Sequence, residues 1–185
     1  MLAEYFKHVA FDALYTSPLI RARKTADAIN LYHNLPISAN EKLMEINAGV
    51  MEGVLWAELT EKHPVQGHYW NDEPWKFAAE GGDSMLDVYE RIWRGITEIV
   101  AENPKKTVVA VSHGGAIRTL LCRVSGLVLE RIKEVEWCDN TGVSIIDFEP
   151  DMTASLIVQN DNTHVPDELS TFARQAKGKG IRAGG

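Results

Sequence analysis

The chain has 185 residues, of which 45% are hydrophobic and 24% are charged. This composition fits one globular domain with a sizeable core, and it excludes a chain that is disordered over most of its length. The sequence contains no run of 18 apolar residues, so we expect no membrane span and no membrane partner. The net charge of −7 disfavours sequence-independent binding to nucleic acid. An anionic substrate would have to be held by local Arg and His side chains, because the overall charge repels it.

The two cysteines, Cys122 and Cys138, form neither a disulfide framework nor a Cys-x-x-Cys metal pair. Both lie among apolar residues, so we expect reduced thiols in the core and a cytoplasmic protein. The N-terminal segment contains charges and no small-residue cleavage site, which predicts no signal peptide. The first four histidines of the chain lack the spacing of metal ligands, and we expect neither a metal nor a cofactor.

Segments typical of strands alternate with segments typical of helices along the chain. The first half predicts a helix end at 2–9, a strand at 12–16, a helix at 19–29, an extended piece near Ile37, a loop at 41–53 and short helices at 55–79. The second half predicts a helix at 85–103, a strand at 107–111, a helix at 116–124 and a hairpin of 142–148 with 153–158. The alternation predicts an α/β fold, a three-layer α/β/α sandwich with a mainly parallel sheet and an antiparallel edge. We expect one domain over residues 1–170 and a flexible tail at 171–185.

Local signals sharpen three of these elements. The run Thr-Val-Val-Ala-Val at 107–111 is typical of a strand that is buried on both faces. Ser17 followed by Pro18 predicts the cap and first turn of the next helix. The segment from Gly81 to Ser84 ends one element and caps the next, whose apolar residues recur at helical spacing.

Two strand-to-helix junctions carry residues suited to binding an anion. In open α/β sheets, ligands bind beyond the carboxyl ends of the strands. One junction contains Ser17 and Arg21, and the other contains His113, Gly114 and Gly115. Each places backbone N–H groups at a helix N-terminus, and the glycines allow a ligand close to the backbone. Arg21 lies about one turn into its helix, where its guanidinium can reach the same anion.

Each candidate also has a simpler explanation when it is considered alone. Arg21 stands among other basic residues and is consistent with an ordinary solvated position. His113 fits a hydrogen-bonded histidine of the core. Glu45, a third candidate in the loop at 41–53, fits a surface carboxylate. The tryptophans of residues 55–79 fit packing better than a stacking platform.

Four motifs stand together in one order along the chain: Thr16-Ser17-Pro18-Leu19-x-Arg21, Leu43-x-Glu45-Ile46-x-x-Gly49-x-x-Glu52-Gly53, Gly82-Asp83-Ser84 and Val111-Ser112-His113-Gly114-Gly115. Together they resemble the histidine phosphatase superfamily, the phosphoglycerate-mutase-like branch, over residues 10–164. The resemblance implies a phosphomonoester hydrolase with a phosphohistidine intermediate, no metal and a phosphorylated small molecule as substrate.

The resemblance also implies roles for the candidate residues. Arg21, Ser17 and Gly114 would bind the phosphate. Glu45 would be the general acid for the leaving alkoxide and later the base for water, as phosphoryl transfer needs one proton shuttle. His113 would donate a hydrogen bond to the transferring phosphoryl group and stabilise its charge.

The chain departs from the family at its first motif. The family's nucleophilic histidine stands in an Arg-His-Gly motif, which does not occur in the 185 residues. His8 does not replace it, because it is followed by Val9 and Ala10 at the end of a helix. In the family, that motif ends a first strand next to the one that ends at His113. We expect this strand and the helix after it, roughly 30 to 40 residues, to be missing.

The missing segment points to a truncated gene or an N-terminally shortened protein, and the alternative is a paralogue without the nucleophile. Either way we expect the chain to be inactive or very weak. We also expect an unpaired strand edge that lowers solubility or is covered in a homodimer.

Two other functions stay open from the sequence. A cofactor-dependent phosphoglycerate mutase is disfavoured, because such mutases carry a longer insertion between Gly53 and Gly81. A non-catalytic module that binds phosphate or a phosphorylated ligand is the alternative outside the enzymes. The cap that would select a substrate is expected to use aromatic residues of this interval: Trp56, Tyr69, Trp70 and Trp75.

Overall fold

The computed structural model describes residues 1–55 and 58–171. Its α-helices are α1 (Leu2–Phe6), α2 (Ile20–Ile29), α3 (Leu59–Lys62), α4 (Pro64–Asp72), α5 (Met85–Glu102) and α6 (Gly114–Val124). Its strands are β1 (Ala13–Thr16), β2 (Ile37–Ala39), β3 (Val108–Val111), β4 (Val143–Phe148) and β5 (Ala154–Asp161). Short 3-10 helices lie at Asn30–Tyr32, Glu41–Leu43, Gly49–Met51, Pro74–Lys76 and Leu129–Glu134. Trp56 and all but the first residue of the expected tail lie outside the described residues.

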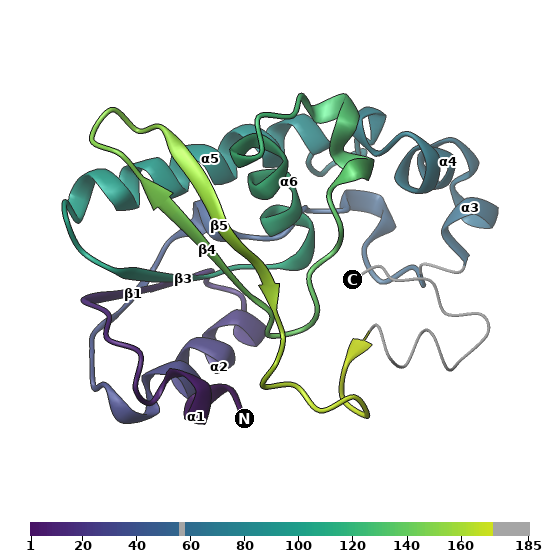
Figure 1. Ribbon diagram of the computed structural model, residues 1–185. Helices are drawn as coiled ribbons and strands as arrows, with labels where there is room; N and C mark the ends of the chain where they lie inside the picture. The colour runs from purple at the N-terminus through teal and green to yellow at the C-terminus, as the bar shows by residue number, and fades with distance from the viewer. Residues whose placement is uncertain (56–57, 172–185) are drawn as a thin grey trace.

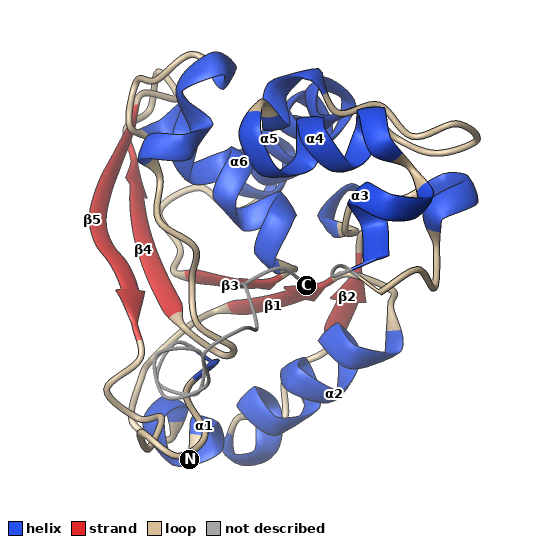
Figure 2. Cartoon of the chain, turned by 90° about the vertical axis from the view of Figure 1, so that its right-hand side faces the viewer, coloured by secondary structure: helices blue, strands red, loops and turns tan. Residues whose placement is uncertain are grey.

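A parallel sheet with the strand order β2-β1-β3 forms the middle layer of the molecule. β1 pairs with β3 from Ala13 and Val108 to Thr16 and Val111, and it pairs with β2 on its other edge. Helices α1 and α2 lie on one side of this sheet, and α5 and α6 lie on the other (Figures 1 and 2). The expected three-layer arrangement is confirmed.

Two apolar clusters fill the spaces between the layers. The larger cluster joins the sheet to α5 and α6, and its fully buried members include Val88, Ile92, Ile99, Leu121 and Cys122. The smaller cluster joins the sheet to α1 and α2, with Phe6, Leu14, Ala26, Ile29 and Val111. β3 contributes side chains to both clusters, because successive residues of a strand point to opposite faces.

The long helix α5 begins where the sequence predicts it. The Ser84 hydroxyl accepts a hydrogen bond from the Asp87 N–H (3.1 Å), and the Asp87 carboxylate accepts one from the Ser84 N–H (2.8 Å). This reciprocal capping box satisfies two N–H groups at the start of the helix. The helix ends at Glu102, with Asn103 as its C-cap before Pro104, close to the expected end.

The expected cap of α2 is wrong in detail. The helix begins at Ile20, and its N-cap position is Leu19. The Ser17 hydroxyl accepts a hydrogen bond from the Leu19 N–H at 3.3 Å, but Ser17 itself still belongs to the end of the sheet, where its N–H donates to Val111. Sheet pairing therefore holds Ser17 outside the helix.

The antiparallel hairpin is confirmed, but it is not an edge of the parallel sheet. β4 and β5 pair antiparallel from Val143 and Asp161 to Phe148 and Ala154 and form a separate two-stranded sheet. Within residues 1–55 and 58–171, no ladder joins β4 to β3. In Figure 1, β4 runs roughly opposite to β3.

The expectation that β3 is buried on both faces is wrong for most of its length. Only Val111 is buried, and Val108, Val109 and Ala110 are partly exposed. The cause is the unpaired edge of β3, which faces a large cleft instead of a neighbouring strand. Ile96 on α5 lines the same cleft and is also only partly buried.

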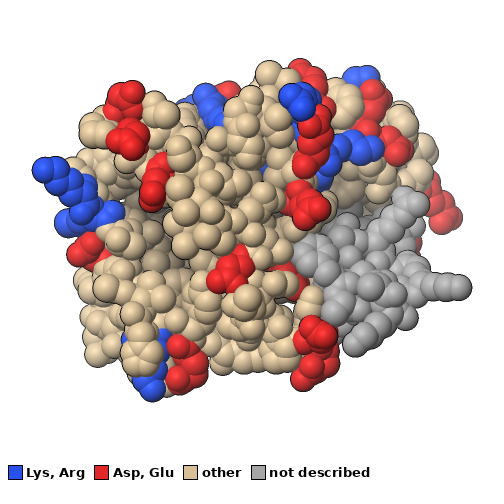
Figure 3. Space-filling view, in the orientation of Figure 1, with Lys and Arg blue, Asp and Glu red and all other residues tan. Residues whose placement is uncertain are grey.

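In the part of the chain that the structure describes, no helix is long and apolar enough to cross a membrane. On the face shown in Figure 3, Lys and Arg side chains lie near the margins, and uncharged side chains cover much of the β4–β5 hairpin. Ile145 and Ile157 are exposed there, at 44% and 56%.

Candidate functional site

The parallel pairing of β1 and β3 brings the two predicted junctions together. Thr16 and Val111 are partners at the carboxyl ends of these strands. Ser17 and His113 follow them directly, so both side chains lie at the same edge of the sheet. This edge is where the sequence predicts an anion site.

Arg21, His113 and Ser17 form a chain of hydrogen bonds. The Arg21 Nε–H donates to His113 Nδ1 at 3.1 Å, and His113 Nε2 lies 2.8 Å from the Ser17 hydroxyl. A guanidinium has no acceptor, so Nδ1 must accept and the ring proton must be on Nε2. His113 therefore presents an Nε2–H donor, which Ser17 accepts.

His113 is neutral in this environment. Its side chain is buried, at 6% exposure. Burial, and then the positive charges of Arg21 and Arg91, lower the pKa of His113 from its ordinary value of 6.5 to about 4. Arg21, by contrast, is exposed, and its guanidinium is accessible to an anion from solvent.

The Glu45 carboxylate lies at the N-terminus of α6. Its Oε2 accepts a hydrogen bond from the Gly115 N–H, and its Oε1 accepts one from the Ala116 N–H, both at 3.0 Å. Oε1 also accepts from the Ile46 N–H at 3.0 Å. The helix N-terminus is therefore occupied by an anion, but this anion is a side chain of the protein.

This contact bears on the expectation that Gly114 and Gly115 allow a ligand close to the backbone. A Cβ on Gly115 would lie 2.6 Å from Glu45 Oε1, so the missing side chain makes room for this carboxylate and not for a ligand. A Cβ on Gly114 would meet Trp137 at an ordinary 3.5 Å. The assignment of Gly114 to the phosphate site stays a prediction.

Arg91, which the sequence reasoning missed, holds the segment that carries Glu45. Its guanidinium donates to the carbonyl oxygens of Lys42 (3.2 Å), Met44 (2.7 Å) and Glu45 (3.2 Å). It also pairs with the Asp83 carboxylate at 3.1 Å, and Asp83 accepts the Asn47 N–H at 3.0 Å. The Gly82-Asp83-Ser84 motif thus acts on the Glu45 loop from the start of α5, and Arg91 lies two turns further along that helix.

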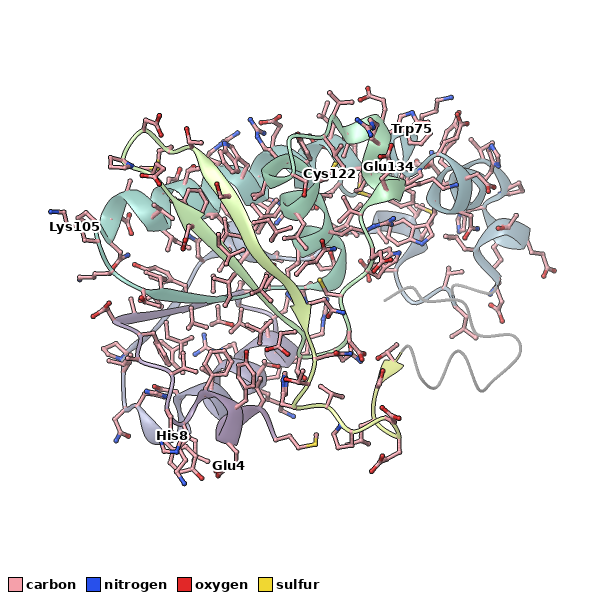
Figure 4. The ribbon with its side chains drawn as sticks, in the orientation of Figure 1. Glu4, His8, Trp75, Lys105, Cys122 and Glu134 are labelled. Atoms are coloured by element: carbon pink, nitrogen blue, oxygen red, sulfur yellow. The ribbon has the colours of Figure 1, made fainter. Side chains whose placement is uncertain are left out.

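One cleft contains Arg21, Glu45, His113 and Gly114 in its lining. Among the described residues, His113 is the only histidine in that lining. His8 is exposed and lies with Glu4 at the α1 end of the molecule (Figure 4), so it is not part of the site. In the described part of the chain, no group of three His, Cys, Asp or Glu side chains is placed to hold a metal ion.

The aromatic cap is only partly as expected. Trp70 lines the cleft and packs edge-on against Phe77, with ring centroids 5.0 Å apart, but Tyr69 and Trp75 are not in the lining. Trp137, which the sequence reasoning missed, lines the cleft 6.5 Å from Trp70. The Arg118 guanidinium lies over the Trp137 ring at 4.6 Å and donates to the Val135 carbonyl at 2.8 Å.

Comparison with known proteins gives a family and named relatives. The family model of the histidine phosphatase superfamily (branch 1) matches residues 1–161. Phosphoserine phosphatase 1 of Hydrogenobacter thermophilus is 33% identical over 149 residues, which cover 80% of this chain and 70% of that protein. The uncharacterized phosphatase PhoE of Bacillus subtilis is 34% identical over 123 residues, which cover 66% of this chain and 58% of that protein.

Solved structures with the same fold agree with this assignment. The YhfR protein of Bacillus stearothermophilus superposes with a TM-score of 0.84 at 27% identity, over 89% of this chain and 81% of that one. The mycobacterial glucosyl-3-phosphoglycerate phosphatase Rv2419c, solved in complex with VO3, superposes with a TM-score of 0.77 at 25% identity, over 86% of this chain and 81% of that one. The four motifs, the layered fold and the family match together show that this chain belongs to the histidine phosphatase superfamily, branch 1.

Proposed function

We propose that this chain carries the phosphate-binding part of a phosphomonoesterase whose substrate is a phosphorylated small molecule. The observation that carries the proposal is the hydrogen-bonded chain of Arg21, His113 and Ser17 at the carboxyl ends of β1 and β3. It supplies an accessible guanidinium and a neutral imidazole whose Nε2–H, accepted by Ser17 in this structure, can be donated to a ligand instead. Both groups suit a phosphoryl oxygen.

The roles follow from these positions. The Arg21 guanidinium binds two phosphoryl oxygens, and Ser17 and the backbone at Gly114 complete the phosphate site. His113 turns its Nε2–H from Ser17 to the phosphoryl group as negative charge develops there. Glu45, as the carboxylic acid, donates a proton to the leaving alkoxide, and as the carboxylate it then takes a proton from the attacking water. Its place in the cleft lining next to His113, at the start of α6, suits this role.

The relatives support the same class of reaction. Three of the four reported above are named as phosphatases, and one of the solved structures holds VO3, an analogue of the transferring phosphoryl group. Their names give different substrates, a phosphoserine and a glucosyl-3-phosphoglycerate, so the reaction class and not the substrate is common to them.

Phosphate binding tests the proposal directly. Isothermal titration of inorganic phosphate or vanadate into the wild-type chain should give saturable binding, and Arg21→Ala should weaken it roughly 10- to 100-fold, the value of one charge-assisted pair. Arg23→Ala is the matched control, because Arg23 is an exposed residue of the same helix. Equal affinity of the wild type and Arg21→Ala for phosphate would contradict the assignment of Arg21 to the phosphate site.

A specific observation favours a second candidate, a phosphate-binding module without turnover. The 185 residues contain no Arg-His-Gly motif. The one histidine in the lining of the described cleft, His113, is buried with both ring nitrogens hydrogen-bonded. A nucleophile must present an unprotected lone pair to phosphorus, and in His113 the only lone pair, on Nδ1, is engaged by Arg21.

A further inference from the structure

The cleft continues from the phosphate site into a part that aromatic side chains enclose. A Cβ on Gly114 would lie 3.5 Å from the Trp137 ring, so this ring stands directly beside the start of α6. The Trp70 ring centroid lies 6.5 Å from that of Trp137, and the Phe77 centroid lies 5.0 Å from that of Trp70. Together with neighbouring apolar side chains, these rings line one end of the cleft, which we call the aromatic arm: Ile46, Met51, Val54, Trp70, Phe77 and Trp137.

The aromatic arm adjoins the position of the leaving group in the proposed reaction. Ile46, in its lining, directly follows Glu45, the residue proposed to protonate the leaving alkoxide. The Glu45 carboxylate binds the N-terminus of α6, which the Trp137 ring borders. With the phosphoryl group between Arg21 and His113, the aromatic arm is therefore the part of the cleft next to the ester oxygen.

The aromatic arm supplies no positive charge for a second anionic group. Among the described residues that line the cleft, the basic side chains are Arg21, Lys105 and Lys106, and Arg21 is assigned to the phosphoryl group. The two lysines precede β3, whose four residues separate them from the phosphate site by about 13 Å of strand. Figure 4 shows Lys105 at the opposite end of the molecule from Trp75, which belongs to the 3-10 helix after α4. The Glu52 carboxylate, in contrast, lines the cleft beside the arm.

Arg118 contacts the aromatic arm from outside and holds the Trp137 ring. Its guanidinium lies over this ring at 4.6 Å, and its Nε–H donates to the Val135 carbonyl oxygen at 2.8 Å. Arg118 does not line the cleft, and the small cavity that it shares with Trp137 has a volume of about 10 Å³, room for about one water molecule. Because a cation over the ring restrains its orientation, this wall of the arm is formed before a ligand binds.

We propose that the substrate is the phosphate monoester of an uncharged alcohol or phenol with an aromatic ring, and that Trp137 and Trp70 bind this ring. This assignment of a substrate class rests on the proposed function. Aromatic rings bury a large apolar area and pack against one another with centroids about 4.5 to 7 Å apart. A carboxylate or second phosphate in the aromatic arm would lose its hydration without gaining a cation. The arm therefore favours a ring and disfavours a second anion.

Three phosphonates test the substrate class in the unmodified protein. Benzylphosphonate carries the ring, ethylphosphonate lacks it, and (4-carboxybenzyl)phosphonate carries the ring and a second anion. Each has a P–C bond in place of the ester bond, so binding is measured whether or not the chain hydrolyses esters. In isothermal titration, benzylphosphonate should bind about tenfold more tightly than ethylphosphonate, because its ring is removed from water. The added carboxylate should weaken binding by about fivefold or more.

Two tryptophan variants show where the ring binds. Trp137→Ala should lower the ratio of the benzylphosphonate and ethylphosphonate affinities from about tenfold to about twofold. Trp93→Ala is the matched control and should leave the ratio unchanged, because Trp93 also lies under a guanidinium, that of Arg123 at 4.9 Å, but does not line the cleft. Thermal melting shows whether both variants are folded, and the phosphonate series on the wild type decides by itself where Trp137→Ala is not.

Inorganic phosphate, titrated in parallel, separates this inference from the proposed function. Saturable phosphate binding with equal affinities for benzylphosphonate and ethylphosphonate would overturn the substrate class and leave the phosphate site in place. Binding of (4-carboxybenzyl)phosphonate as tight as that of benzylphosphonate, or equal effects of Trp93→Ala and Trp137→Ala, would also overturn it. Failure of phosphate itself to bind would overturn the proposed function and the substrate class together.

Discussion

At the scale of single residues, the state of His113 decides what the site can do. A buried imidazole beside two guanidinium groups is neutral at pH 7, and the Arg21 N–H determines which ring nitrogen carries the proton. The neutral ring is a donor with one fixed direction, and this suits charge stabilisation better than nucleophilic attack. Gly115 also shapes the site, because the absence of a Cβ there allows the Glu45 carboxylate to reach the N-terminus of α6.

The pKa of His113 predicts how stability depends on pH. The pKa is about 4 in the folded protein and 6.5 for an ordinary histidine, so between these values the unfolded chain binds more protons. The contribution of His113 to the free energy of unfolding is therefore most favourable above pH 6.5 and falls by about 3 kcal/mol as the pH drops towards 4. Urea unfolding of the wild type at pH 7, 6, 5 and 4 measures the fall.

His113→Gln is the control for this measurement, because glutamine keeps a donor and an acceptor and does not titrate. Its unfolding free energy should fall less between pH 6.5 and 4 than that of the wild type. Parallel curves for the two proteins would contradict the neutral buried state of His113.

At the scale of elements, α5 supports the loop that carries Glu45 and also contributes to the core. Its apolar face packs against α6. Asp83 lies just before the helix, and Arg91 lies on the side of the helix that faces the Glu45 loop. A single guanidinium there satisfies three carbonyl oxygens that no regular element pairs. The loop needs this support, because it contains only short 3-10 turns of its own.

Replacing Arg91 should therefore cost more than replacing an exposed residue of the same helix. We expect Arg91→Ala to lower the free energy of unfolding by about 2 to 4 kcal/mol, because three part-buried carbonyl groups lose their partner and Asp83 loses its ion pair. Arg94→Ala, an exposed position one turn further on, should change it by less than about 0.5 kcal/mol. Chemical denaturation measures both, and equal effects of the two substitutions would show that the clamp is not structural.

At the scale of the whole molecule, the arrangement of the two sheets around the cleft determines which steps of phosphoryl transfer we expect. The binding groups come from β1, α2, β3 and α6, all of which are in place, and the position between β3 and β4 holds no strand of the described chain. The family's nucleophile stands at the end of a strand that the sequence analysis expects next to β3. We therefore expect that phosphate binding and turnover can be separated in this molecule.

We predict that the 185-residue chain hydrolyses p-nitrophenyl phosphate at a rate roughly 10⁴- to 10⁶-fold below that of a phosphatase that carries the Arg-His-Gly motif, because a catalytic unit loses most of its effect with its nucleophile. Adding an N-terminal segment that ends a strand in Arg-His-Gly should restore turnover. The restored activity should be sensitive to His113→Ala and Glu45→Gln. An ordinary phosphatase rate in the unextended chain, unchanged by His113→Ala, would exclude the family mechanism here.

The sequence by itself determined the order and type of the elements. The capping box at Ser84, the β-branched run of β3 and the turn between β4 and β5 depend on residues a few positions apart, so local periodicity predicts them. The motif order also led to Ser17, Arg21, Glu45 and His113 as candidates, and all but Ser17 line one cleft in the structure, with Ser17 bonded to His113.

Only the tertiary structure decided how these residues are engaged. The Glu45 carboxylate binds α6 across 71 positions of sequence, and Arg91 reaches back 47 positions to Met44. The unpaired edge of β3 agrees with the strand edge expected from the missing first motif, but the resulting exposure of β3 does not follow from its apolar composition. The burial of Val108, Val109 and Ala110 was overestimated for the same reason. Each of these outcomes depends on which distant groups come within hydrogen-bonding or packing distance, and no local period of the sequence contains that information.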